Sequence, residues 1–167
     1  MASTISITIT GDKETVSVLK KIAKDIQNPL EPLDLSSKKY LNYISANFED
    51  EGKTFGKPWA PLRPATIEIK RGLKDKGEAI EVEKPLVRTG LMRRSFGYSI
   101  KGNKDSSIYN KTDYALVHQE GGTVFFKGQP RKVPKRTLAE VDDTRIKMVS
   151  MTFESWIYRL IKKYKAG

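Results

Sequence analysis

The chain has no cysteine and only one histidine, His118, among its 167 residues. The absence of cysteine excludes disulfide bonds, thiolate nucleophiles and zinc sites that contain cysteine. With a single histidine, a metal site would have to be built from carboxylates. Adjacent acids occur at Glu49, Asp50 and Glu51. Because acids that follow a helix are usually a solvated end, we expect no metal site there and no cofactor.

Long hydrophobic runs are also missing. No apolar stretch approaches the roughly 20 residues that a membrane-spanning helix needs. The first ten residues, MASTISITIT, lack the basic start and the long apolar block of a secretory signal. We therefore expect a protein that is made in a cytoplasm and has no membrane partner.

Acidic residues are outnumbered. The chain carries 31 Lys and Arg against 20 Asp and Glu, which gives a net charge of +11. Such a charge costs self-repulsion on folding, so it indicates a polyanionic or strongly acidic partner. Nucleic acid and an acidic protein surface both fit this description. The 38% of hydrophobic residues is ordinary for a soluble globular protein, and the length suits one domain.

Periodic apolar residues predict three long helices. Asp12 is expected to cap the first helix, which stops at Pro29. After a proline-containing connector, Asp34 or Ser36 is expected to cap the second. Residues 143–165 have the longest apolar stripe in the chain and predict a long amphipathic helix at the C-terminal end.

Proline and aromatic residues mark the segment between the second helix and the middle of the chain. Residues 49–64 are expected to form an irregular loop that Phe55 and Trp59 anchor. Pro64 suits the first turn of a short helix, where its missing N–H is not needed. Thr89 is expected to cap another short helix.

Alternating residues and turn signals predict several short strands. The expected strands, in chain order, are 3–10, 96–101, 106–110, 123–126 and 131–133. Gly102-Asn103 and residues 127–130 are the expected hairpin turns. Together the elements predict an α+β fold, with a small antiparallel β-sheet flanked by helices and a long C-terminal amphipathic helix.

His118 lies in the stretch YALVHQEGGT, beside Glu120 and a glycine pair. As a general base it would need an orienting carboxylate. In a helical turn, however, residues i and i+2 do not face each other, so Glu120 is expected to point away. We favour a structural turn, in which Tyr114 buries its ring, His118 bonds to the backbone and the glycines reverse the chain. We expect no catalytic residue.

Basic residues gather at two places. The C-terminal group complements the negative end of the last helix and is expected to be a solvated face. The second group falls in the second predicted hairpin and the residues after it. For this group a phosphate-contacting surface and a solvated face both remain open. Its members are Lys127, Arg131, Lys132, Lys135 and Arg136.

Four segments occur in an order that resembles a known family: KPWAPLRPATIEIKRG, PLVRTGLMRRSFGYSI, YALVHQEGGT and PRKVPKRTLAEVD. The chain is similar to the phage virion-morphogenesis, or tail-completion, family of contractile-tailed bacteriophages and prophages. The matching residues are Trp59, Leu62 and Thr66; Leu86, Thr89, Gly90 and Leu91; and Tyr114, Ala115, His118 and Gly121. Before the last helix the chain departs from the family's Arg-Pro-Phe-Leu order, since it has Pro134-Lys135-Arg136-Thr137-Leu138. The resemblance covers residues 35–165.

The resemblance implies a non-enzymatic structural protein of the phage neck or tail. Such a protein completes or terminates the tail and enables head–tail joining as part of an oligomeric, commonly six-fold, ring. One domain is expected over 1–167, with an N-terminal strand and helix over 1–34 and the tail-completion-like region over 35–165. The resemblance also implies that the turn residues are structural. These residues are Tyr114, Ala115, His118, Gly121 and Gly122.

The expected partners are other copies of the chain and neighbouring tail and neck proteins, with transient contact to genomic DNA in the ring lumen. The expected location is the virion, after assembly in the host cytoplasm. We place the contact surface on the second hairpin and the loop around Trp59, at Trp59, Leu62, Phe125, Phe126, Arg131, Lys132, Lys135 and Arg136. The alternative is a stand-alone basic nucleic-acid-binding protein, which the charge alone supports.

Overall fold

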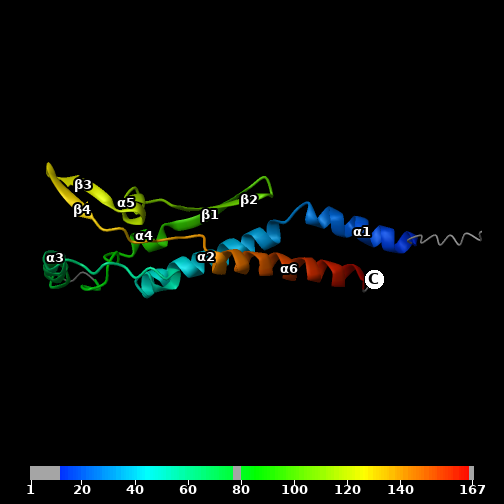
Figure 1. Ribbon diagram of the computed structural model, residues 1–167, viewed down its shortest axis with the longest axis horizontal. Coiled ribbons are helices and arrows are strands. Elements are labelled where there is room, and N and C mark those ends of the chain that lie inside the picture. Colours follow the sequence, from blue (N-terminus) through cyan, green and yellow to red (C-terminus); the bar gives the residue numbers. More distant parts are fainter. Residues whose placement is uncertain (1–11, 77–79, 166–167) are drawn as a thin grey trace, which may run out of the picture.

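Six α-helices and four strands make up the described part of the chain, residues 12–76 and 80–165 of this computed structural model. The predicted α+β class is confirmed, and the molecule is elongated (Figure 1). The strand expected over 3–10 lies outside the described residues. The elements are α1 (Lys13–Ile26), α2 (Leu30–Glu49), a 3-10 turn η1 (Lys53–Phe55), α3 (Pro64–Lys74), α4 (Leu91–Arg94), β1 (Phe96–Lys101), β2 (Asp105–Asn110), α5 (Ala115–Glu120), β3 (Gly122–Phe126), β4 (Gln129–Val133) and α6 (Asp143–Lys165).

The helices α1, α2 and α6 form the long axis of the molecule. As predicted, Asp12 caps α1, and its carboxylate accepts a hydrogen bond of 2.6 Å from the backbone N–H of Thr15. The prediction for α2 was wrong, because the helix begins at Leu30 and not after Asp34 or Ser36. Pro32 stands in the first turn, where backbone N–H groups have no helical partner, so proline is tolerated there.

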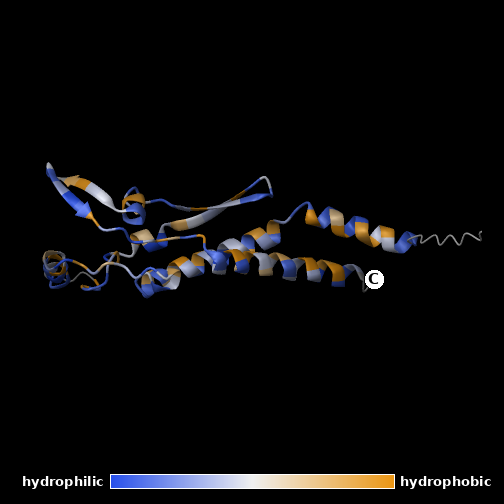
Figure 2. Cartoon of the chain, in the orientation of Figure 1, coloured by the Kyte–Doolittle hydropathy of each residue, from blue (hydrophilic) through white to orange (hydrophobic). Residues whose placement is uncertain are grey.

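The last helix runs antiparallel to α1 and α2 and packs against both (Figure 1). An ion pair of 2.5 Å joins Arg159 of α6 to Glu31 of α2. Further along, the Lys39 ammonium donates to the Thr152 hydroxyl at 2.9 Å. Figure 2 shows hydrophobic and hydrophilic residues interleaved along these helices. Within residues 12–76 and 80–165, no helix is long and apolar enough to cross a membrane.

The described strands form two separate antiparallel hairpins, where the sequence predicted one small sheet. The first hairpin pairs Phe96 with Asn110 and turns through Gly102 and Asn103, which both have positive φ, as predicted. The second hairpin pairs Gly122 with Val133. It turns at Lys127 and Gly128. The β3–β4 hairpin lies at the end of the molecule that also holds α3 (Figure 1).

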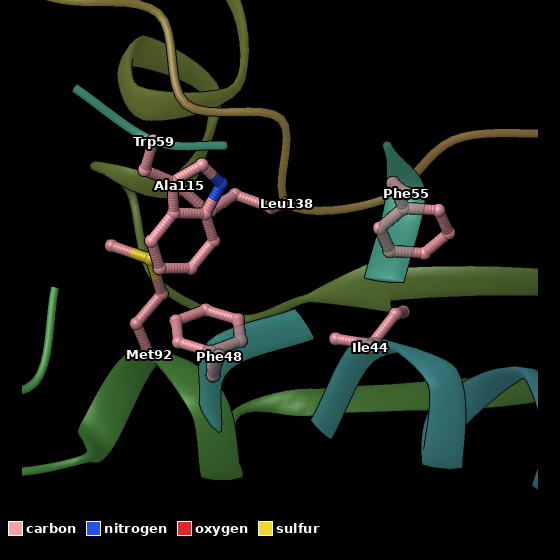
Figure 3. Close-up of a cluster of buried hydrophobic side chains, with 7 residues drawn as sticks. All are labelled: Ile44, Phe48, Phe55, Trp59, Met92, Ala115 and Leu138. Carbon is pink, nitrogen blue, oxygen red and sulfur yellow. The ribbon is translucent and has the colours of Figure 1, made fainter. Parts of the chain in front are cut away.

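The hydrophobic core joins α2 to the loop that follows it, as predicted for Phe55 and Trp59. Figure 3 shows the Phe48 ring facing Trp59, with their centroids 5.2 Å apart in an edge-to-face arrangement. Each large buried side chain of this kind contributes about 1.5–3 kcal/mol. The cluster consists of Ile44, Phe48, Phe55, Trp59, Met92, Ala115 and Leu138.

Polar side chains fix the segment that leads into α6. The Thr137 carbonyl accepts two bonds of 2.9 Å, from the Asn47 amide and from the Trp59 indole N–H. The Asn47 carbonyl oxygen accepts from the backbone N–H of Phe55 at 3.3 Å. At the residue after Thr137, the backbone N–H of Leu138 donates to the side-chain oxygen of Gln119 at 2.7 Å. These bonds hold segment 134–142 against α2 and α5.

Candidate interaction surface

The YALVHQEGGT stretch forms α5 and its exit into β3. Gly121 has φ 73°, and an added Cβ would lie 2.8 Å from the backbone nitrogen of Lys135. Only glycine fits this reversal without strain, as the sequence indicated. Ala115 is buried in the core, but the Tyr114 side chain is exposed, so the prediction that its ring is buried was wrong. Tyr114 is the residue that precedes the first turn of α5.

His118 makes no catalytic pair with Glu120. The Glu120 carboxylate lies 3.9 Å from the Lys135 ammonium. Burial, and then the positive charge of Arg136, lower the pKa of His118 below its ordinary value. Its Nδ1 atom is buried and has no hydrogen-bond partner in the described chain, so this atom does not make the predicted bond to the backbone. The ring instead packs edge-on against Tyr114.

Two residues that the sequence placed on a contact surface lie inside this chain. Trp59 is part of the core. Arg136 is buried, and its guanidinium donates to the Ala60 carbonyl at 2.8 and 3.1 Å and to the Pro61 carbonyl at 3.4 Å. Arg136 therefore fastens the 134–142 segment to the loop before α3. The Trp59 side chain presents no surface to a partner in this structure, and that part of the prediction is corrected, whereas Arg136 is held at the wall of a cleft.

The remaining predicted residues are spread over the second hairpin and one cleft. Phe125 projects from β3 with 76% of its side chain exposed, and Lys135 is exposed beside Glu120. The Phe126 side chain is not among the described parts. Four of the predicted contact residues line the cleft, namely Leu62, Arg131, Lys132 and the buried Arg136.

This cleft, which we call the basic cleft, has a volume of about 1040 Å³ and lies between α3, the 86–92 segment, α5 and β4. Its walls are apolar, and none of the described residues that line it is acidic. The apolar part is formed mainly by Leu62, Ile69, Leu73, Leu86, Val87 and Leu91. The cations that line it are Arg63, Lys70, Arg88, Arg131, Lys132 and Arg136.

Lys70 is a buried cation of this cleft that the sequence analysis missed. Its ammonium donates to the carbonyls of Glu81 at 2.5 Å and Lys84 at 2.7 Å. Burial lowers the pKa of Lys70 below its ordinary value. These bonds tie α3 to the segment after it. No signal in the local sequence marks such a role, because the acceptors are backbone carbonyls 11 and 14 residues away.

The acidic cluster after α2 forms no metal site. Glu49 pairs with Arg93 at 2.9 Å, and Asp50 accepts from the Thr54 hydroxyl at 2.6 Å. Across the described residues, no group of three or more histidine or acidic side chains is arranged to hold a metal ion.

Comparison with known proteins gives one match. The model of the phage virion morphogenesis family matches residues 12–157, which is most of the chain. No curated protein and no solved structure matches. Proteins of this family have structural and assembly roles in the virion. The chain therefore belongs to the phage virion morphogenesis family, and it is a virion-associated structural or assembly protein.

Proposed function

We propose that the protein is a non-catalytic component of the phage neck or tail. It completes or terminates the tail and enables head–tail joining as part of an oligomeric ring, six-fold in the simplest case. Family membership supports the virion role. The observation that carries the finer proposal is the basic cleft, which combines apolar walls and cations without an acidic lining residue.

An acidic protein surface suits the basic cleft better than DNA does. Partners at protein interfaces bury apolar groups beside complementary charges. The outside of duplex DNA presents phosphates, which leave the apolar walls formed by Leu62, Ile69 and Leu91 without a counterpart. The cleft therefore selects a partner that carries carboxylates and apolar side chains together.

Charge magnitudes lead to the same conclusion. A ring about 35 Å tall would surround on the order of 20 phosphates of threaded DNA, at one charge per roughly 1.7 Å. Six copies at +11 each carry far more positive charge than that. A lumen lined by all of it would grip DNA and prevent its passage. Most basic residues are therefore assigned to acidic neighbours or solvent.

Charge reversal in the cleft tests this function. The double variant Arg131→Glu, Lys132→Glu is compared with Lys101→Glu, Lys104→Glu at the tip of the β1–β2 hairpin, where both lysines are exposed. Heads and tails are mixed with each protein, and joined particles are counted by electron microscopy. We expect the cleft variant to block joining while the tip variant supports it.

DNA affinity, measured over a range of salt concentrations, separates the alternative function. We expect the cleft variant to lose joining far more than DNA binding. Equal loss of both activities would contradict the proposal. Nanomolar DNA binding by the wild-type monomer, with a steep salt dependence, would instead support a stand-alone nucleic-acid-binding protein.

A further inference from the structure

Helix α1 has an apolar face that is wider than its contact with α6. At about 100° per residue, Val18 and Ile22 lie on one side of this face and are partly buried. Val16, Leu19 and Ile26 form an adjacent stripe that is exposed, and 59% of Leu19 is accessible. No residue of α1 is buried. Figure 2 shows the hydrophobic residues repeating along this helix.

An isolated helix of 14 residues is marginal in water, and its stability in a protein comes from packing of its apolar face. The contacts of α1 with α6 include polar ones, such as the bond of 2.8 Å from the Tyr164 hydroxyl to Asp25. These contacts leave the exposed stripe of α1 uncovered. Because contiguous apolar surface of this kind marks interaction sites, we treat the stripe as a candidate interaction site.

A second apolar surface lies elsewhere on the molecule and is concave. A groove of about 910 Å³ runs between the β1–β2 hairpin, α5 and the α2–α6 pair. Apolar side chains from each of these elements line it, including Leu33, Ile108, Leu116, Ile146 and Val149. Leu116 and Ile146 are among the most exposed apolar residues of the chain, and 70% of Leu116 is accessible.

Polar groups of the groove complement α1. Glu140 lines the groove, and 30% of its side chain is exposed. One carboxylate oxygen accepts from Lys57 at 2.5 Å, and the other, Oε2, is buried without a hydrogen-bond partner in the part of the chain that is described. On α1, the helical period places Lys13, Lys20 and Lys24 along the edge of the exposed stripe. A lysine at this edge can lie beside the exposed part of the Glu140 side chain while the apolar stripe enters the groove.

One copy cannot join these two surfaces in this conformation. Helix α1 contacts the C-terminal part of α6, near Tyr164, whereas the groove extends along α6 only as far as Phe153. At 1.5 Å per residue, these positions are about 16 Å apart along the helix axis. Figure 1 likewise shows α1 beside the C-terminal end of α6 and away from α5. Contact between the two surfaces therefore requires a second copy of the chain.

We propose that the exposed stripe of α1 packs into the α2–α6–hairpin groove of a second copy of this chain. The two surfaces differ, one convex and one concave, so the contact is head-to-tail and repeats from copy to copy. A head-to-tail contact closes into a ring when its rotation allows. This inference rests on the proposed function, because it supplies the contact between neighbouring subunits of the ring.

Two exposed residues test the contact from its two sides. Leu19→Asp places a charge on the α1 stripe, and Leu116→Asp places one in the groove. The matched control is Met151→Asp on α6, because Met151 is 56% exposed and lies outside both surfaces and outside the basic cleft. Sedimentation velocity is expected to show oligomers for wild type and control, and monomers for each of the other two variants.

Mixing the two monomeric variants is the decisive step. Leu19→Asp retains an intact groove and Leu116→Asp retains an intact α1, so an equimolar mixture is expected to form dimers and nothing larger. A wild-type protein that stays monomeric overturns the inference. Oligomers of Leu116→Asp equal to wild type also overturn it, since they indicate a symmetric contact between α1 helices. Failure of the two variants to form dimers when they are mixed likewise overturns the inference.

The outcome is separate from the test of the proposed function. A monomeric wild-type protein, or a mixture that fails to pair, removes this interface and leaves the virion role in place. Heads and tails that join without the protein remove the role itself.

Discussion

The substitution Asn47→Ala tests the polar bonds that support the core and the start of the basic cleft. Asn47 is fully buried at 0% exposure and bonds to two segments. Its amide donates to Thr137 in the segment before α6, and its carbonyl oxygen accepts from Phe55 in the loop after α2. Alanine removes both bonds but leaves the surrounding side chains unchanged.

The expected loss of stability follows from the hydrogen bonds that each partner of Asn47 retains after the substitution. The Thr137 carbonyl keeps its bond from Trp59, so only the net value of one hydrogen bond is lost there, about 0.5–1.5 kcal/mol. The Phe55 N–H loses its acceptor within the core, which costs about 1–3 kcal/mol. The free energy of unfolding should fall by about 1.5–4.5 kcal/mol. At ~2–4 °C per kcal/mol for a chain of this size, Tm should fall by about 3–18 °C.

Thermal unfolding followed by circular dichroism measures this loss. All variants are compared at one protein concentration, because assembly adds to apparent stability. A loss below about 1 kcal/mol would refute the assigned bonding, since a buried unpaired N–H costs more than that.

Asn47→Asp is the companion variant. Its carboxylate keeps an acceptor for Phe55 but sets a second oxygen against the Thr137 carbonyl. Burial without a cation raises the pKa of such a carboxyl in the folded state. The folded protein then binds the proton more tightly, so stability is retained at low pH and lost as pH rises. The difference in the free energy of unfolding between wild type and Asn47→Asp should be larger at pH 7 than at pH 4. The corresponding difference for Asn47→Ala should stay constant.

Three further predictions concern the cleft and its turn. Gly121→Ala should lose about 1–3 kcal/mol of stability in urea unfolding because of the positive φ, while Gly72→Ala, in open space within α3, should gain about 0.4–1 kcal/mol. The pKa of His118 is lowered in the folded protein, so the unfolded chain binds a proton more readily. Wild type should therefore lose stability relative to His118→Asn as pH falls below about 6.5. Parallel stability profiles of the two proteins against pH would contradict this. Lys70→Met should speed proteolysis within 80–90, since the ammonium no longer holds the backbone carbonyls there; an unchanged cleavage rate would show that Lys70 does not order that segment.

Local patterns predicted the elements that depend on local physics. The cap at Asp12, the long C-terminal helix and the turn at Gly102-Asn103 follow from residues within a few positions of each other. The start of α2 was missed because prolines were taken as breaks. Pro32 does not break the helix, since its position in the first turn needs no N–H.

Features that depend on contacts between distant segments could not be predicted from the sequence. Arg136 was assigned to a contact surface and Lys70 was given no role, yet both are buried because carbonyls from other segments accept from their side chains. The lining of the cleft was predicted only in part, through Leu62, Arg131, Lys132 and Arg136. Arg63 completes it through the packing of α3 near β4, which no local pattern specifies. The separation of the hairpins into two sheets is likewise a property of long-range packing.

Electron microscopy of particles made without the protein tests the central claim most directly. The gene is inactivated in the phage that encodes it, and wild-type protein or the Leu19→Asp variant is supplied in trans. We expect filled heads and separate tails without the protein, joining restored by wild type, and little restoration by Leu19→Asp. Joined, infectious particles in the complete absence of the protein would contradict the account.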